Sequence, residues 1–194
     1  FYLPYNMKEI SSLLLGIIAM AIIFNTVYKN MNYTTVKSNV NGKSYLVRKL
    51  PDKQAAADKL ATISNSLSNL TKSLKVDERD GIDQLKAYFN PDNLTENAPG
   101  GTYTAYSVNK GEQLALCLRN VKDNTFIEDN TIYFVAIHEL AHIMTDEVGH
   151  TPKFWDNMKF LLIKAQELGI YTHQDYSQFP VDYCGQKIES TPMK

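Results

Sequence analysis

The stretch His138-Glu139-Leu140-Ala141-His142 carries the strongest signal for fold and chemistry in this chain. On a helix, residues four apart lie one turn above each other on the same face, so both imidazoles can reach one metal ion. The carboxylate of Glu139 stands beside the first imidazole, where it can act on a metal-bound water. This pattern indicates a zinc-hydrolase site with two histidine ligands and a general base.

Apolar residues on both sides of this stretch predict a helix that is buried nearly all round. Residues 131–137 read Thr-Ile-Tyr-Phe-Val-Ala-Ile, and Ile143 and Met144 continue the apolar run. A core helix that carries two histidines and no metal is the alternative interpretation. It would bury polar side chains without partners, which is costly, and a metal ion would supply the missing partner.

A catalytic zinc site normally has three protein ligands and one open position. His150 is the first candidate for the third ligand, because Gly149 predicts a helix end and Thr151-Pro152 the start of the next helix. A short turn between two helices keeps its residues close to both. The alternatives for the third ligand are His173, in the polar tail beyond the second helix, and Glu147. His150 as a turn residue that binds no metal is a further alternative.

These residues resemble the WLM and SprT-like group of zinc metallopeptidases. In that group a third histidine, and a Phe-Trp pair on the next helix, follow the first motif, as they do here in Gly149-His150-Thr151-Pro152-Lys153-Phe154-Trp155. The metzincin spacing does not apply, because its glycine would fall at Thr145. The resemblance implies one catalytic zinc ion held by three histidines, with a glutamate as the base: His138, His142, His150 and Glu139.

The resemblance extends to WLM-like proteins of large double-stranded DNA viruses. It rests on four further stretches, at residues 47–53, 106–112, 117–119 and 183–185. Cellular members of the group are tied to proteolysis of proteins crosslinked to DNA. The virus-type members look membrane-anchored, and some of them look like virion components. The resemblance therefore implies a viral protein and capsid proteins as partners.

Charge and composition argue against direct nucleic-acid binding. The 194 residues include 20 basic and 21 acidic ones, and the densest basic cluster is the pair Arg48-Lys49. Binding to nucleic acid depends on neutralising phosphates with basic side chains. The length suits one domain of moderate size with an extra segment. The sequence begins at Phe1, so we expect an initiator methionine or a longer leader before it.

The cysteine content predicts a reducing compartment, because Cys117 and Cys184 are too few for a disulfide framework. A zinc-binding pair is an alternative, but a cysteine in an apolar run such as 114–118 usually belongs to the core. Asn-x-Thr sequons are about as frequent as chance predicts and do not argue for secretion; they begin at Asn32, Asn69 and Asn93.

Residues 10–28 contain no charged side chain and predict a single-pass membrane anchor that contacts the lipid bilayer. As a helix these residues span about 28 Å, close to the hydrocarbon thickness of a bilayer. A signal peptide and a buried core helix are the alternatives, although no small-residue cleavage site follows the run.

Basic residues predict the orientation of this anchor. Lys8 alone precedes the span, whereas five basic residues follow it: Lys29, Lys37, Lys43, Arg48 and Lys49. The positive-inside rule then predicts that the C-terminal domain lies in the cytosol. In a virus with an internal membrane, that side corresponds to the one facing the capsid.

The resemblance implies an α+β, zincin-like fold with a small antiparallel sheet, an active-site helix and backing helices. We expect a membrane anchor at 1–29, an extended linker or hairpin at 30–50 and the metallopeptidase domain at 51–194. Strands are expected at 33–36 and 44–47 around the turn Asn41-Gly42, and at 102–108 and 113–119. Helices are expected from 51 onward, at 82–89 and at 151–168, with a loop at 90–101.

The helix that begins near residue 51 has one apolar face. Its apolar positions follow each other at steps of three or four residues: Ala56, Leu60, Ile63, Leu67, Leu70 and Leu74. We interpret this face as part of the domain core. A coiled-coil seam for a partner is the alternative.

Two parts of the domain are candidates for substrate contacts. The strands at 102–108 and 113–119 precede the metal-binding helix, and in zinc peptidases of this kind a strand edge holds the substrate main chain. The polar tail contains Tyr171, Tyr176 and Tyr183, one of which could donate to the oxyanion formed on the attacked carbonyl. Sequence does not choose among them.

The sequence thus predicts a membrane-anchored zinc metalloendopeptidase acting on a protein or peptide substrate through a metal-activated water. The alternative is a structural membrane protein of a virion, a minor capsid protein, that uses a peptidase-like fold as a docking module. Repair of DNA–protein crosslinks is a third hypothesis and rests on family analogy alone.

Overall fold

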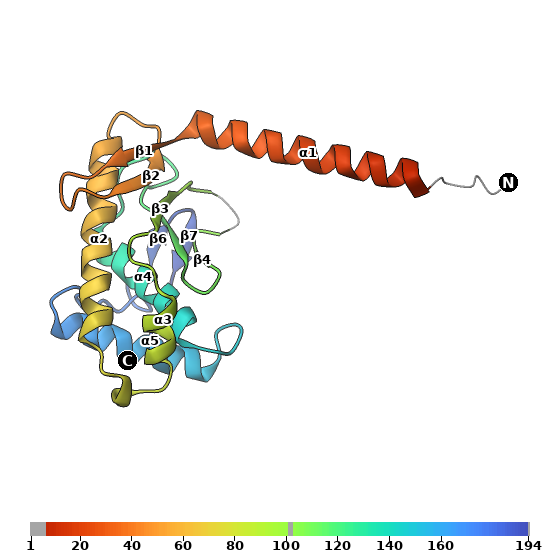
Figure 1. Ribbon diagram of the computed structural model, residues 1–194. Coiled ribbons are helices and arrows are strands. Elements are labelled where there is room, and N and C mark those ends of the chain that lie inside the picture. Colours follow the sequence, from red (N-terminus) through yellow and green to blue (C-terminus); the bar gives the residue numbers. More distant parts are fainter. Residues whose placement is uncertain (1–6, 101–102, 194) are drawn as a thin grey trace. The chain divides into compact units, whose positions relative to one another are not determined.

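A computed structural model describes residues 7–100 and 103–193 (Figure 1). Contacts within the chain divide it into two compact units, Phe1–Thr34 and Thr35–Lys194. The first unit contains helix α1 (Met7–Asn32). Its part from Ile10 to Asn32 has a mean hydropathy of 2.2 and is exposed throughout, so it is not a core helix of this chain. Its length and composition are sufficient for a helix that crosses a membrane, and a signal sequence can have the same length and composition.

The second unit is built on a five-stranded sheet with the strand order β1-β2-β3-β5-β4. Its strands are β1 (Tyr33–Lys37), β2 (Ser44–Arg48), β3 (Leu94–Asn97), β4 (Ala105–Val108) and β5 (Gln113–Cys117). The hairpin predicted around Asn41-Gly42 is present, and Gly42 adopts the positive φ of 72° that its turn requires. The predicted domain boundaries at residues 29 and 50 stay a prediction.

The predicted α+β class is confirmed, but the prediction of an antiparallel sheet is wrong. Within the five-stranded sheet β2 and β3 run parallel, as do β3 and β5, whereas β4 and β5 are antiparallel. The chain between β2 and β3 contains helices, and such a crossover is what a parallel pair needs. The loop predicted at 90–101 contains β3, whose sequence Leu-Thr-Glu-Asn carries no apolar alternation.

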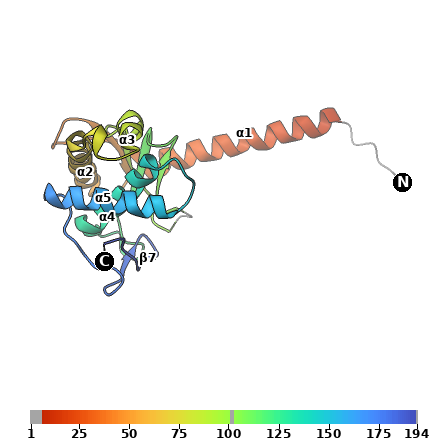
Figure 2. The ribbon, with the colours of Figure 1, turned by 90° about the horizontal axis from the view of Figure 1, so that it is seen from below.

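Helix α2 (Lys53–Ser73) packs against β2 and β3 and is followed by a single 3-10 turn (Val76–Glu78) and α3 (Ile82–Tyr88). The predicted apolar face of α2 is buried in the core from Ala56 to Leu74, so the prediction of a core face is confirmed. Helix α4 (Asp129–Met144) packs against β4, β5, α3 and α5. Helix α5 (Pro152–Glu167) lies beside α4, as Figure 2 shows from below.

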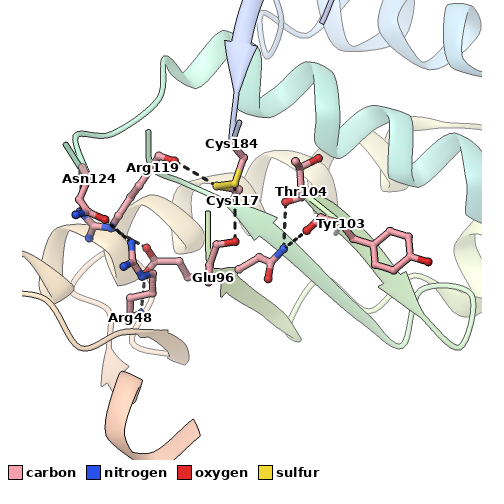
Figure 3. Close-up of a disulfide and its surroundings, with 10 residues drawn as sticks. Arg48, Glu96, Tyr103, Thr104, Cys117, Arg119, Asn124 and Cys184 are labelled. Carbon is pink, nitrogen blue, oxygen red and sulfur yellow. Dashed lines mark hydrogen bonds and ion pairs between the residues drawn. A yellow bond between two sulfur atoms is a disulfide. The ribbon is translucent and has the colours of Figure 1, made fainter. Parts of the chain in front are cut away.

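The tail forms a separate two-stranded sheet of β6 (Val181–Tyr183) and β7 (Gln186–Ile188). A disulfide joins Cys184, in the turn of this strand pair, to Cys117 at the end of β5 (Figure 3). Their Cα atoms are 6.0 Å apart, within the usual range for a disulfide. The expectation that the two cysteines are not joined in a disulfide is therefore wrong, and the reducing compartment stays a prediction. The tail folds back over 67 residues of sequence, and the sequence carries no sign of that return.

A buried ion pair between Arg119 and Glu96 lies at the end of the sheet, next to the disulfide (Figure 3). The guanidinium of Arg119 donates to a carboxylate oxygen of Glu96 at 2.7 Å and to Asp52, at the start of α2, at 2.7 Å. Arg119 and Glu96 are both almost fully buried. These contacts link β3, the segment that follows β5 and the start of α2. Loss of either Arg119 or Glu96 would leave the other charge buried without a partner, which is costly.

Candidate metal centre

Helix α4 presents His138 and His142 on one face. Their Nε2 atoms lie 3.1 Å apart. The helix is apolar nearly all round and most of its side chains are buried, as its sequence predicted. Helix α4 ends at Met144. The hydroxyl of the next residue, Thr145, donates to the carbonyl oxygen of Ala141 at 2.7 Å. The side-chain amide of Asn157 on α5 donates to the same hydroxyl at 2.9 Å, which ties the two helices together beside the site.

The turn between α4 and α5 brings His150 to the two helical histidines. Gly149 adopts a φ of 89°, which reverses the chain without the strain that a side chain would bring. Thr151 caps α5, because its hydroxyl accepts a hydrogen bond from the main-chain N–H of Phe154 at 3.3 Å. The Nε2 atom of His150 lies 3.1 Å from that of His138 and 3.2 Å from that of His142.

The three Nε2 atoms fit the donor set of a tetrahedral zinc site. Two nitrogen ligands of such a site lie about 3.3 Å apart when each bond is about 2.05 Å. Burial, together with a smaller effect of the neighbouring imidazoles, lowers the pKa of His138 to about 3 and that of His142 to about 4. These imidazoles are therefore neutral near pH 7, which is the form that binds metal. The phenyl ring of Phe154 packs on all three rings, with centroids 4.3 to 4.8 Å away.

Glu139 lies beside this cluster and is buried. Burial disfavours the charged carboxylate and raises its pKa to about 7, while a hydrogen bond from the backbone of Ser107 acts in the opposite direction. A carboxyl group with a pKa near neutrality can accept a proton and release it again. Ser107 belongs to β4, so the edge of the sheet positions the carboxylate of the helix. Sequence analysis did not single out Ser107.

The two alternative residues for the third metal ligand lie outside the histidine cluster. Among the described residues, the cluster of side chains that could hold a metal ion consists of His138, His142 and His150. His173 and Glu147 are exposed and do not belong to it. The structure therefore brings together the three predicted histidines and leaves out both alternatives.

Comparisons with known proteins identify the family of this chain and several relatives. The model of the WLM domain matches residues 39–181. This chain belongs to the WLM family. The predicted resemblance to proteins of large DNA viruses is confirmed, since an uncharacterized protein of Acanthamoeba polyphaga mimivirus is 36% identical over 189 residues, covering 94% of this chain and 95% of that protein. An uncharacterized protein of Invertebrate iridescent virus 6 is 38% identical over 82 residues, covering 41% of this chain and 44% of that protein.

The fold of this WLM protein has a solved counterpart. The crystal structure of Wss1 from Saccharomyces cerevisiae superposes with a TM-score of 0.51 at 24% identity and covers 63% of this chain and 87% of that chain. The second unit of the chain therefore has a metallopeptidase-like fold of the WLM family.

A cleft of about 720 Å³ opens over the histidine cluster of this WLM domain. It is lined by the three histidines and Glu139, by apolar side chains of α4 and α5, and by two segments far apart in sequence: residues 103–107, which include most of β4, and residues 186–190, which include β7. A cleft of this size can take a peptide segment. The second lining segment carries no recognisable signal in the sequence, because its position depends on the folding back of the tail.

The structure separates the three candidate tyrosines. Tyr171 and Tyr176 pack against Phe134 in the core, with ring centroids 6.1 and 4.5 Å away. Tyr183 is buried as well, but it lines the cleft together with Glu139. Burial raises the pKa of the Tyr183 hydroxyl, so this group stays protonated near pH 7.

Proposed function

We propose that this chain is a membrane-anchored, zinc-dependent metallopeptidase that hydrolyses peptide bonds. The observation that carries the proposal is the triangle of Nε2 atoms, 3.1 to 3.2 Å on each side, beside a buried glutamate at the floor of an open cleft. His138, His142 and His150 would hold the zinc ion. When bound, zinc lowers the pKa of its coordinated water and polarises a substrate carbonyl.

Glu139 is the proton carrier in this proposal. Its carboxylate takes a proton from the attacking water and delivers it to the nitrogen of the leaving amine. Burial raises the pKa of this carboxyl, which makes it a better proton acceptor than an exposed carboxylate. The hydrogen bond from Ser107 keeps the carboxylate aligned with the cleft.

Replacing Glu139 tests this proposal directly. In Glu139→Gln we expect about one zinc ion per chain to remain bound and peptide cleavage to fall by roughly 100- to 10,000-fold, the usual contribution of a general base. Zinc content by plasma emission spectrometry and digestion of a peptide library are the measurements. The matched control is Glu147→Gln, an exposed carboxylate in the same turn region, which should keep both zinc and activity. Undiminished cleavage by Glu139→Gln would contradict the proposal.

Helix α1 supports the membrane part of the proposal, with the lipid bilayer as the partner of residues 10–28. The basic residues that follow the helix favour the cytosolic, capsid-facing side for the second unit. The disulfide favours oxidising surroundings. Both observations are compatible with a domain that is made in the cytosol and oxidised at a later stage.

The alternative role as a docking module has lost one of its supports. The apolar face of α2, which could have been a seam for a partner, is buried inside the domain of this chain. The metal centre and its open cleft favour a peptidase. Capsid proteins stay a proposal as partners, and the balanced charge of the chain continues to argue against direct binding to nucleic acid.

A further inference from the structure

The cleft has one lining segment that is anchored differently from the rest of the site. Residues 181–190, here called the C-terminal wall, comprise β6, β7, the two-residue turn between them and the two residues that follow β7. Tyr183 and residues 186–190 of this wall line the cleft. The metal-binding histidines come from α4 and the turn after it, and residues 103–107 come from the main sheet. The C-terminal wall therefore completes the cleft without contributing to the candidate metal ligands.

Hydrogen bonding to a larger sheet does not hold this wall in place. Within the described part of the chain, β6 and β7 pair with each other and form a sheet of two strands. An isolated pair of strands is at best marginally stable in water. Its turn, Cys184-Gly185, has φ values of 55° and 88°, and the first of these is unfavourable for a residue with a side chain. The strand pair thus needs an attachment to the rest of the domain.

The disulfide supplies this attachment at the turn of the pair. Cys184 and Cys117 are both buried (Figure 3), and Cys117 is the last residue of β5, which lies between β3 and β4 in the main sheet. The other contacts of this strand pair with the domain are noncovalent. The N–H of Gly100 donates to the carbonyl oxygen of Cys184 at a long 3.4 Å. The side chain of Tyr183 is buried in the core, whereas Val181 and Ile188 are only partly buried against it.

The segment that contains β4, by contrast, is held in place by hydrogen bonds to the main sheet. Four consecutive residues of β4 pair with β5, from Ala105 to Val108. The side-chain amide of Asn97 also donates to the carbonyl oxygens of Tyr103 and Thr104, at 2.7 and 3.3 Å. This side of the cleft does not depend on the disulfide.

We propose that the Cys117–Cys184 disulfide holds the C-terminal wall against the cleft, so that peptide binding in the cleft depends on the redox state of this pair. With the disulfide formed, the wall is in place and the cleft is complete. With both sulfurs reduced, the wall detaches while the main sheet, α4 and the histidine cluster stay folded. The link to peptide binding rests on the proposed peptidase function, whereas the movement of the wall does not.

The redox step involves two electrons. A cellular dithiol that reduces the pair gives up two electrons and two protons, breaks the S–S bond and becomes a disulfide itself, leaving Cys117 and Cys184 as thiols. In the laboratory a water-soluble trialkylphosphine does the same, taking an oxygen atom from water to form its phosphine oxide. Because both sulfurs are buried, reduction first requires local opening of the wall.

Hydrogen exchange of the full chain in detergent micelles tests the position of the wall. The oxidised wild type is compared with the phosphine-reduced wild type, with Cys184→Ser and with Asp182→Asn, an exposed residue of β6 outside the cleft. We expect roughly tenfold or greater loss of protection at residues 181–190 in the reduced and Cys184→Ser proteins, with α2 and α4 unchanged. Asp182→Asn should match the wild type. The phosphine should not alter Cys184→Ser, which has no disulfide to reduce.

Two results would overturn the proposal. The first is unchanged protection of residues 181–190 after mass spectrometry has shown both cysteines as thiols. The second is a simultaneous loss of protection in α2 and α4, since the disulfide would then support the whole domain and not the wall.

Peptide cleavage is a second, independent measurement of the effect of the disulfide on the cleft. For zinc-loaded protein we expect reduction to raise KM about tenfold and to leave the zinc content unchanged, with Asp182→Asn again as the control. If the oxidised, zinc-loaded chain cleaves no peptide, the peptidase function fails, and the exchange experiment still decides whether the disulfide holds the wall.

Discussion

At the residue scale, the site depends on which nitrogen each imidazole presents. All three histidines direct their Nε2 atoms toward one another, within 3.2 Å. The helical pair was predictable, because a spacing of four residues places two side chains on one face. His150 was predictable from Gly149 and Thr151, which mark a short turn, although the sequence left His173 and Glu147 as alternatives. The role of Ser107 was not predictable, since it comes from a strand that only the fold brings to Glu139.

The first residue-scale prediction concerns the third histidine. We expect His150→Ala to weaken zinc binding by roughly 100-fold or more, because losing even an outer-shell partner of a metal site commonly costs 10- to 100-fold. Competition with a fluorescent zinc chelator measures the affinity. His173→Ala is the matched control, because His173 is exposed and lies outside the cluster. The assignment of ligands would be overturned if the two variants bound zinc equally well.

At the scale of elements, the strand that borders the cleft is the edge of the main sheet. In the antiparallel pair of β4 and β5, Tyr106 lies opposite Ala115. The N–H of Cys117 donates to the carbonyl oxygen of Thr104, so Thr104 and, two residues on, Tyr106 are the positions whose main chain bonds to β5. By this alternation the main-chain groups of Ala105 and Ser107 face away from β5. The N–H of Ser107 is engaged by Glu139, which leaves the main chain of Ala105 available to a substrate.

The element-scale prediction follows from this free edge. In Ala105→Pro the outward N–H is removed without loss of a bond to β5, and proline is tolerated at edge strands. We expect KM for peptides to rise about fivefold with kcat little changed, since one hydrogen bond contributes about 1 kcal/mol. Steady-state kinetics on one cleaved peptide is the measurement. Ala105→Val serves as the control, since it keeps the N–H; a KM for the proline variant equal to that of the valine variant would refute strand addition at this position.

At the scale of the whole molecule, the chain has two units whose sequences differ in kind. The first is an exposed apolar helix, and the second is a domain with a continuous core. The two cysteines of the second unit are 67 residues apart and meet only after the tail has folded back.

The whole-molecule prediction concerns the anchor. Replacing both Ile17 and Ile18 by lysine should abolish membrane insertion, because each lysine at the centre of a spanning helix costs about 2.5 to 3.5 kcal/mol. The full chain should stay in the pellet after carbonate extraction of membranes, and the double variant should appear in the supernatant. Val40→Lys, at an exposed position outside α1, is the control. Recovery of the wild-type chain in the supernatant, or a mass showing that α1 has been cleaved off, would contradict a membrane anchor.

The sequence by itself determined the features that depend on neighbours along the chain. The histidine pair on α4, the apolar faces of α2 and α4, the cap at Thr151 and the apolar length of α1 all follow from spacing and local chemistry. The tertiary structure alone decided the parallel strands, the central position of β3, the hydrogen bond to Glu139 and the disulfide that joins β5 to the C-terminal wall. Each of these joins segments distant in sequence, and their proximity arises from the packing of the whole core rather than from any local pattern.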